Sequence, residues 1–354
     1  DIDLLGDEKW RERVGFTSRY LSTTHFMQEG SWTWQIPIDR NVVSFGIVYD
    51  KSIVKDNTET EEGFVSLIKK NPFVNKLLEN AKLLDFQRNS ALDFKRKHFA
   101  LSEKVIFLGE AFGFIDPFYS PGSDIISREC YMMKNLIESG DNYEHRRNVV
   151  NQYVSNEFEY LNLLYKDQYQ SFGSFNIYNI KSKWDFYCYT NRLVWLFYSK
   201  KYGNFDWVEN EVGNHYLTLK LTKAIQTGFI ELNKHLRSID EYESSNTNNY
   251  SLKQNRFVFE ELILASKYSD QLSRQNNYSI CMLTICELLE VRFKLKNLVN
   301  NKIIQDHLTL AVLCEFELTE KWFNSFLAKI SLTLKNIFKI ELIVTIDDFR
   351  AGNF

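Results

Sequence analysis

The 354-residue sequence lacks several features that would assign it to a functional class directly. It contains neither a signal-peptide pattern nor an uninterrupted apolar run long enough to span a membrane. Its formal net charge of −3 offers no general electrostatic attraction for nucleic acid or anionic lipid. It also has no G-x-G-x-x-G after an expected strand, the usual fingerprint for holding a dinucleotide pyrophosphate. We therefore expect a cytoplasmic protein without a transmembrane segment or a nucleic-acid partner.

Cysteine and histidine are sparse, and neither forms a pattern. The sequence has no C-x-x-C pair, and its six histidines show no spacing typical of metal ligands, so we assign no metal site. An odd number of scattered cysteines favours buried free thiols in a reducing compartment over a disulfide or zinc framework. The five cysteines are Cys130, Cys188, Cys281, Cys286 and Cys314.

Proline is rarer still, and its distribution divides the chain. All four prolines lie at or before Pro121, and beyond that residue apolar side chains recur mainly at helical spacing. We expect a fold of the α/β plus α type, with residues 1–140 as a mixed first part and residues 141–354 as a mainly helical region. A polar, turn-rich stretch at residues 241–255 predicts an exposed loop.

Two neighbouring strands are the clearest expected elements of the first part. Trp32, Trp34 and Ile36 alternate with polar residues and a proline, which is the period of a strand, and residues 42–49 form a second such run. Together they predict a hairpin with both indoles on one face. Residues 104–108 predict a further strand, and periodicity leaves residues 332–346 open between helix and strand. Helices are expected at residues 61–70, 72–84, 123–139, 143–169, 260–268 and 280–298.

The most informative stretch runs from Leu108 to Gly122 and reads L-G-E-A-F-G-F-I-D-P-F-Y-S-P-G. An expected strand precedes it and an expected helix follows it, so its turn would present backbone N–H groups and a positive helix end to an electron-rich ligand. The stretch resembles the second flavin motif, G-D-A-A-G-F-x-D-P-x-x-S-x-G, of FAD-dependent halogenases and related aromatic monooxygenases.

A second match lies upstream, where Trp32 to Pro37 read W-T-W-Q-I-P. This run is similar to the W-x-W-x-I-P signature of flavin-dependent halogenases of the tryptophan type, and the two motifs occur in the family's order. The resemblance implies the C-terminal portion of such a protein: part of a Rossmann-like FAD-binding domain with a β-sheet substrate face, followed by helices that cover the substrate. The family's G-x-G-x-x-G and its lysine would lie before Asp1, and we expect the native protein to be longer.

The resemblance also assigns roles to individual residues. Trp32 and Trp34 would form the wall of a channel between flavin and substrate, and Ser120 and Gly122 would hold the halide. The residues implied in FAD binding are Gly109, Glu110, Gly113, Pro117, Gly122 and Ser123. Three positions depart from the family: Glu110 replaces Asp, Tyr119 replaces the Glu of tryptophan halogenases, and Pro121 has no N–H to donate.

An intact enzyme of this kind would react a flavin hydroperoxide with halide and halogenate an electron-rich aromatic compound, often in secondary metabolism. The substrate would be an aromatic small molecule or one tethered to a carrier protein, and a separate reductase could supply reduced FAD. The many aromatic residues at 184–198 fit core packing between helices or an aromatic-lined pocket. Two alternatives remain: an FAD-dependent monooxygenase or polyprenyl-reductase-like enzyme, and a non-catalytic remnant or subunit that needs a separate FAD-binding partner.

Overall fold

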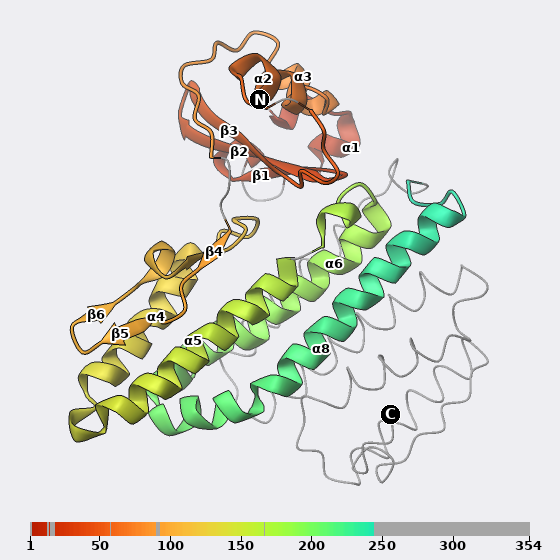
Figure 1. The fold of residues 1–354 in the computed structure, drawn as a ribbon. Coiled ribbons are helices and arrows are strands. Elements are labelled where there is room, and N and C mark those ends of the chain that lie inside the picture. The colour runs from red at the N-terminus through yellow and green to blue at the C-terminus, as the bar shows by residue number, and fades with distance from the viewer. Residues whose placement is uncertain are drawn as a thin grey trace, which may run out of the picture.

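A computed structural model shows an N-terminal sheet, two short β-ribbons and a set of long helices (Figure 1). The structure describes residues 2–12, 14, 18–56, 58–89, 93–165 and 167–243. The helices expected at 260–268 and 280–298, the segment 332–346 and residues 244–255 of the expected loop lie outside these residues. Among the described helices, none has the length and apolar character needed to cross a membrane.

The N-terminal sheet is antiparallel and has the order β1-β2-β3. Its strands are β1 (Thr24–Gln28), β2 (Ser31–Asp39) and β3 (Val42–Tyr49). The hairpin of the second and third strands confirms the prediction from alternating residues. Gly30 turns the chain between the first two strands at φ +77°, a conformation that glycine adopts without steric cost.

One face of this sheet packs against short helices. Phe26 from the sheet shares a buried cluster with Ile2, Ile68 and Val74, and the helices lie on this side in Figure 1. The Asn71 side chain caps the last of these helices, as the Asn-Pro pair predicts. The elements are η1 (Ile2–Leu4), α1 (Glu8–Arg11), η2 (Arg19–Leu21), α2 (Glu61–Ile68) and α3 (Pro72–Leu77). The expected helix at 72–84 is therefore too long, because the chain leaves helical geometry after Leu77.

The middle of the chain forms two short antiparallel ribbons. They consist of β4 (Phe94–Lys95) with β7 (Gly113–Phe114), and β5 (Ala100–Ser102) with β6 (Val105–Ile106). The strand expected at 104–108 is shorter than predicted and turns back on its neighbour. The described residues contain no parallel strand pair, so a Rossmann-like sheet remains an expectation carried by the resemblance alone.

Two helices follow the flavin-like motif in close agreement with the sequence. They are α4 (Gly122–Ile137) and α5 (Tyr143–Tyr165), joined by η4 (Gly140–Asn142). Gly140, between the two helices, has φ +53°, a conformation that glycine adopts without steric cost. Cys130 is exposed on that helix, so the prediction of a buried thiol is wrong there, whereas Cys188 is buried as predicted.

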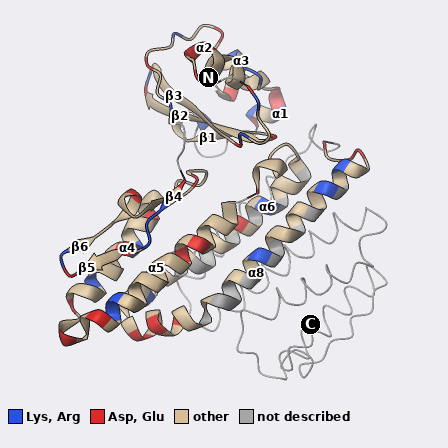
Figure 2. Cartoon of the chain, viewed as in Figure 1, with Lys and Arg blue, Asp and Glu red and all other residues tan. Residues whose placement is uncertain are grey.

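The remaining described elements are helical, as expected for this part of the chain. They are η5 (Tyr169–Ser171), α6 (Phe175–Cys188), a π-helical turn (Tyr189–Val194), α7 (Trp195–Tyr198), η7 (Lys201–Gly203) and α8 (Phe205–Ser238). Helices α5 and α8 lie side by side and share the largest apolar core with α4 and α6 (Figure 1). Acidic and basic residues are interspersed along the described elements (Figure 2).

Candidate functional site

The two tryptophans of β2 form one continuous aromatic surface. Trp32 and Trp34 lie on the same face of the strand, with ring centroids 5.7 Å apart, which confirms the expectation from alternation. Their cross-strand partners in β1 are Met27 and His25, so these side chains share the face. Trp32 is only 2% exposed, and burial lowers the pKa of His25, which keeps the imidazole neutral near pH 7.

The flavin-like motif reaches this aromatic surface directly. The ring of Phe118 stands edge-on to Trp32 with centroids 5.2 Å apart, and Phe172 from the helical region lies 5.0 Å from Phe118. These three residues form a buried cluster. Two motifs that are distant in the sequence therefore meet at one place in the fold.

Tyr169 joins the two motifs through its hydroxyl group. The indole Nε1–H of Trp32 donates to the Tyr169 hydroxyl at 3.3 Å, and that hydroxyl donates to the carboxylate of Asp116. The backbone carbonyl of Tyr169 also accepts from the N–H of Gly30 at 2.9 Å. Burial raises the pKa of Asp116, and the hydrogen bond from Tyr169 opposes that shift by stabilising the carboxylate.

The chain makes a tight turn at Pro117 to Ser120. The N–H of Ser120 donates to the carbonyl of Pro117 at 2.8 Å, and Ser120 has φ +53°, in the left-handed region that residues with a Cβ seldom adopt. Upstream, the Asp116 carboxylate accepts from the N–H of Phe118 at 3.0 Å. Ser120 itself is exposed.

Tyr119 points from this turn into the helical region. Its hydroxyl donates to Asp185 Oδ2 at 3.1 Å, and the other oxygen of Asp185 pairs with Lys181. Lys181 also donates to the carbonyl of Leu164 at 3.1 Å and is 1% exposed. Burial and the neighbouring Asp185 carboxylate both raise the pKa of Tyr119, so its hydroxyl stays protonated and donates.

Helix α4 begins directly after the turn with an open first residue. Pro121 occupies the N-cap position, where no side chain caps the helix. Gly122 and Ser123 are exposed, and a Cβ on Gly122 would meet nothing within 4 Å. The first backbone N–H groups of a helix have no intrahelical acceptor, and they carry the positive end of the dipole. The start of α4 can therefore donate hydrogen bonds to an electron-rich group.

The start of the motif is organised around a residue that sequence reasoning missed. Gly109 has φ +54°, and its N–H donates to the carboxylate of Glu129 on α4. Glu129 is 4% exposed, and burial raises its pKa to about 7. Glu110, the acidic residue expected to contact the cofactor, is exposed. Helical spacing from Ile125 and Met132 places Glu129 beside apolar positions, and that signal could have identified it.

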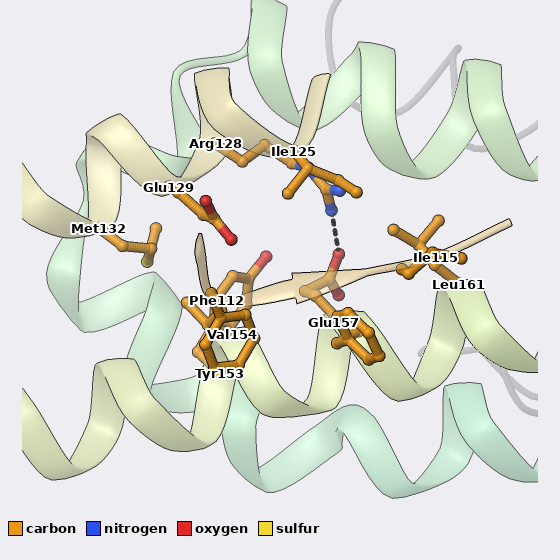
Figure 3. A pocket seen from close by; sticks show the side chains of 11 residues that line it. Phe112, Ile115, Ile125, Arg128, Glu129, Met132, Tyr153, Val154, Glu157 and Leu161 are labelled. Carbon is orange, nitrogen blue, oxygen red and sulfur yellow. Dashed lines mark hydrogen bonds and ion pairs between the residues drawn. The ribbon is translucent and has the colours of Figure 1, made fainter. Parts of the chain in front are cut away.

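A small cavity of about 30 Å³ lies between the motif, α4 and α5 (Figure 3). Arg128 Nη1 and Glu157 Oε2 form a buried ion pair 2.7 Å apart beside it. Gly113 adjoins this region, where a Cβ would approach Phe158 to 2.5 Å, so only glycine fits. The residues that line the cavity are Phe112, Ile115, Ile125, Arg128, Glu129, Met132, Tyr153, Val154, Glu157, Phe158 and Leu161.

Comparison with known families finds one whose sequence matches both motifs. Residues 13–171 match the family model described as tryptophan halogenase, a range that includes both motifs and Tyr169. Residues 13–171 are similar to tryptophan halogenases. The matched range ends at residue 171, so most of the helical region lies outside the match.

Two curated relatives of this chain are halogenases by name. Flavin-dependent halogenase chlA of Dictyostelium discoideum is 30% identical over 133 residues, which cover 35% of this chain and 22% of the relative. The 1H-pyrrole-2-carbonyl-[peptidyl-carrier protein] chlorinase of Pseudomonas fluorescens is 23% identical over 153 residues, covering 40% and 34%. This chain therefore spans only part of either relative's length.

Solved structures of halogenase PltM are also similar to this chain. One aligns with a TM-score of 0.43 and 15% identity, covering 77% of this chain and 53% of that one. A mutant of the same halogenase in complex with FAD aligns with a TM-score of 0.38 and 15% identity over the same shares.

The structure brings together some of the expected site residues and separates others. Trp32 and Trp34 meet the turn that leads to Ser120, and Gly122 and Ser123 follow at the open end of α4. Gly109, Glu110 and Gly113 lie at the other end of the motif, around the short ribbons. Among the described residues, no group of three or more His, Cys, Asp and Glu side chains could hold a metal ion.

Proposed function

We propose that this chain forms the halide-facing turn and the tryptophan wall of a cytoplasmic FAD-dependent halogenase that acts on electron-rich aromatic compounds. The observation that carries this proposal is the bridge from Trp32 through the Tyr169 hydroxyl to Asp116. It joins the two motifs at the start of the turn that leads to α4, whose open first turn would offer backbone donors to a halide.

The exposed residues of the motif fit one edge of a flavin cofactor. Gly122 leaves open space where a side chain would stand, and no side chain competes for the first N–H groups of α4. Glu110 is exposed and can offer its carboxylate to a ribityl hydroxyl. Gly109 would contribute through its conformation, since its N–H is already bonded to Glu129. The proposed FAD-binding residues are Gly109, Glu110, Gly113, Pro117, Gly122 and Ser123.

When bound, FAD would supply the activation of oxygen that halogenation needs. The residues of this chain would supply position and charge. The N–H groups of Gly122 and Ser123, with the Ser120 hydroxyl, would bind the halide, while Pro121 contributes no donor. The buried indole of Trp32 would exclude water on the sheet side of the turn and separate an aromatic substrate from the cofactor.

The substrate would be an electron-rich aromatic, either free or tethered to a carrier protein. The tethered form is supported by the name of one relative, which acts on a pyrrole carried by a peptidyl carrier protein. A separate flavin reductase would serve as the electron source. The segment that holds the FAD pyrophosphate would come from elsewhere, since the sequence lacks G-x-G-x-x-G.

Halide dependence of turnover tests this proposal. The protein, supplied with the segment that holds the FAD pyrophosphate, would be incubated with FAD, a flavin reductase, NADH and oxygen, with a phenol or pyrrole probe and sodium bromide. Products would be identified by mass spectrometry. We expect a brominated product that requires bromide and is strongly reduced by Ser120→Ala. The control is Tyr49→Phe, which removes a hydroxyl of β3 that bonds to Thr58.

Each other outcome would contradict the proposal. A hydroxylated probe formed without bromide would indicate a monooxygenase, and reduction of an isoprenoid double bond would indicate a polyprenyl-reductase-like enzyme. A folded protein that fails to quench FAD fluorescence would indicate a non-catalytic remnant, or a subunit whose cofactor is bound by another chain.

A further inference from the structure

We infer that Tyr169 and Asp185, both in the helical region, are positioning residues that hold the Ser120 turn in its halide-facing conformation. This inference rests on the proposed function, because it explains how the proposed halide donors are kept in place. Neither residue belongs to the two sequence motifs, and Asp185 lies beyond the range that matches the family.

The turn cannot be held by its own backbone alone. Within the described turn, one hydrogen bond joins backbone groups, from the Ser120 N–H to the Pro117 carbonyl. Ser120 adopts φ +53° without glycine's freedom, and a conformation of this kind persists only where the surroundings enforce it. Side-chain contacts on either side of the turn meet that requirement.

The first contact holds the turn to the sheet. The Asp116 carboxylate accepts from the Phe118 N–H with one oxygen and from the Tyr169 hydroxyl with the other. The same hydroxyl accepts from Trp32 Nε1–H, so one side-chain atom fixes both the tryptophan wall and the start of the turn. All these groups are largely buried, where hydrogen bonds to a carboxylate are strong.

The second contact holds the turn to α6. The Tyr119 hydroxyl donates to Asp185, and Asp185 is kept in place by Lys181, one helical turn before it. Both members of this ion pair are buried, so their geometry is set by packing rather than by solvent. Ser120 directly follows Tyr119, so a shift of this anchor would move the proposed halide ligand.

Removing single hydroxyl groups tests the inference with little change of shape. Tyr169→Phe deletes the bridge to Asp116 and Trp32, and Tyr119→Phe deletes the bond to Asp185 while leaving its pair with Lys181. The control Tyr49→Phe deletes a hydroxyl in β3 that bonds to Thr58 and not to Trp32, Asp116 or Asp185. Hydrogen exchange and two-dimensional NMR would be recorded on the whole ¹⁵N-labelled chain.

We expect the Ser120 amide to exchange at least tenfold faster in both variants than in the wild type and in Tyr49→Phe. In Tyr169→Phe the Trp32 indole N–H signal should also move, which a general loss of stability would not cause at that group alone. Unchanged exchange at Ser120 in both folded variants would overturn the inference, whatever the protein's activity.

A bromide titration separates this inference from the proposed function. In the wild type we expect bromide to shift the amide signals of Gly122 and Ser123, and in Tyr169→Phe we expect at least fivefold weaker binding. No shift in the wild type would overturn the proposed halide site, while the exchange data would still decide whether Tyr169 positions the turn. Equal bromide affinity in wild type and both variants would overturn the role in halide positioning.

Discussion

The two ends of the motif between Leu108 and Gly122 are held in different ways. Gly109 donates its N–H to Glu129, a residue of the helix that follows the motif directly. The Ser120 end depends on Tyr169 and Asp185, which lie much further along the chain. One end is therefore fixed within a local motif-and-helix unit, and the other only after the helical region has packed.

The two ends also differ in what their backbone conformation requires. Both Gly109 and Ser120 have a positive φ, but glycine adopts it freely while serine needs support from outside the turn. The more strained end is the one we propose to bind the halide, which fits the tendency of strained backbone to occur at functional sites. Changes at either end should therefore have distinct and measurable effects.

The largest effect is expected from Lys181→Met, which breaks the support of the Ser120 end. It would leave the Asp185 carboxylate buried without its cation, and such changes typically cost about 3–5 kcal/mol. Urea denaturation measures the loss. The double variant Lys181→Met/Asp185→Leu should recover most of the stability, because it removes the unpaired charge. A loss below about 1 kcal/mol in Lys181→Met would show that this ion pair does not stabilise the Ser120 end.

Gly109→Ala tests the Gly109 end of the motif and should lower the free energy of unfolding by about 3 kcal/mol. The left-handed conformation is unfavourable for alanine, and its Cβ would approach Ile126 Cγ1 to 2.8 Å. The control is Gly122→Ala, where φ is not positive and the new Cβ meets nothing within 4 Å. Thermal and urea unfolding should show a large loss for the first and almost none for the second; equal losses would mean that backbone conformation does not distinguish the two glycines.

Glu129→Gln tests the Gly109 end through the pH dependence of the protein's stability. The folded protein raises the Glu129 pKa from 4.5 to about 7, so between these values the native state binds more protons than the unfolded chain. The contribution of Glu129 to the free energy of unfolding therefore falls as pH rises from about 4.5 to 7. Above pH 7 that contribution no longer changes with pH. The glutamine variant should lack this loss and be roughly 2 kcal/mol more stable at pH 8, provided its side-chain oxygen accepts from Gly109.

Urea unfolding of wild type and Glu129→Gln at pH 5, 6, 7 and 8 measures this difference. The Glu110→Gln variant serves as the control, because Glu110 is exposed and neighbours the same glycine. Parallel stability curves for wild type and Glu129→Gln across this range would contradict the assignment of a raised pKa to Glu129.

The smallest effect is expected from Ser120→Gly. Glycine adopts φ +53° without the penalty of a Cβ, so we expect a gain of up to about 1 kcal/mol in stability, partly offset by the greater freedom of the unfolded chain. Differential scanning calorimetry would measure it, with Ser123→Gly as the comparison in a helical conformation, where a loss is expected. A loss of stability in Ser120→Gly would indicate that Ser120 is supported by contacts of its side chain.

Local elements were predictable because their signals are local. The alternation around Trp32 and Trp34 specified a strand with both indoles on one face, and the pair Asn71-Pro72 specified a helix start. Helix ends were less accurate, since α3 stops at Leu77 without a strong sequence signal. The short antiparallel ribbon at β6 could not be foreseen, because strand pairing depends on partners outside the strand.

Local sequence alone was enough to predict the two motifs, the hairpin, α4 and α5, and the similarity of residues 13–171 to tryptophan halogenases. These depend on periodicity, capping and residue identity, all of which are properties of neighbouring residues. Only the tertiary structure placed Tyr169 between Trp32 and Asp116, buried Glu129 under Gly109, and connected Tyr119 to Asp185. Such contacts join residues 20 to 137 positions apart, and they form only when packing excludes water from polar groups that the sequence alone would leave at the surface.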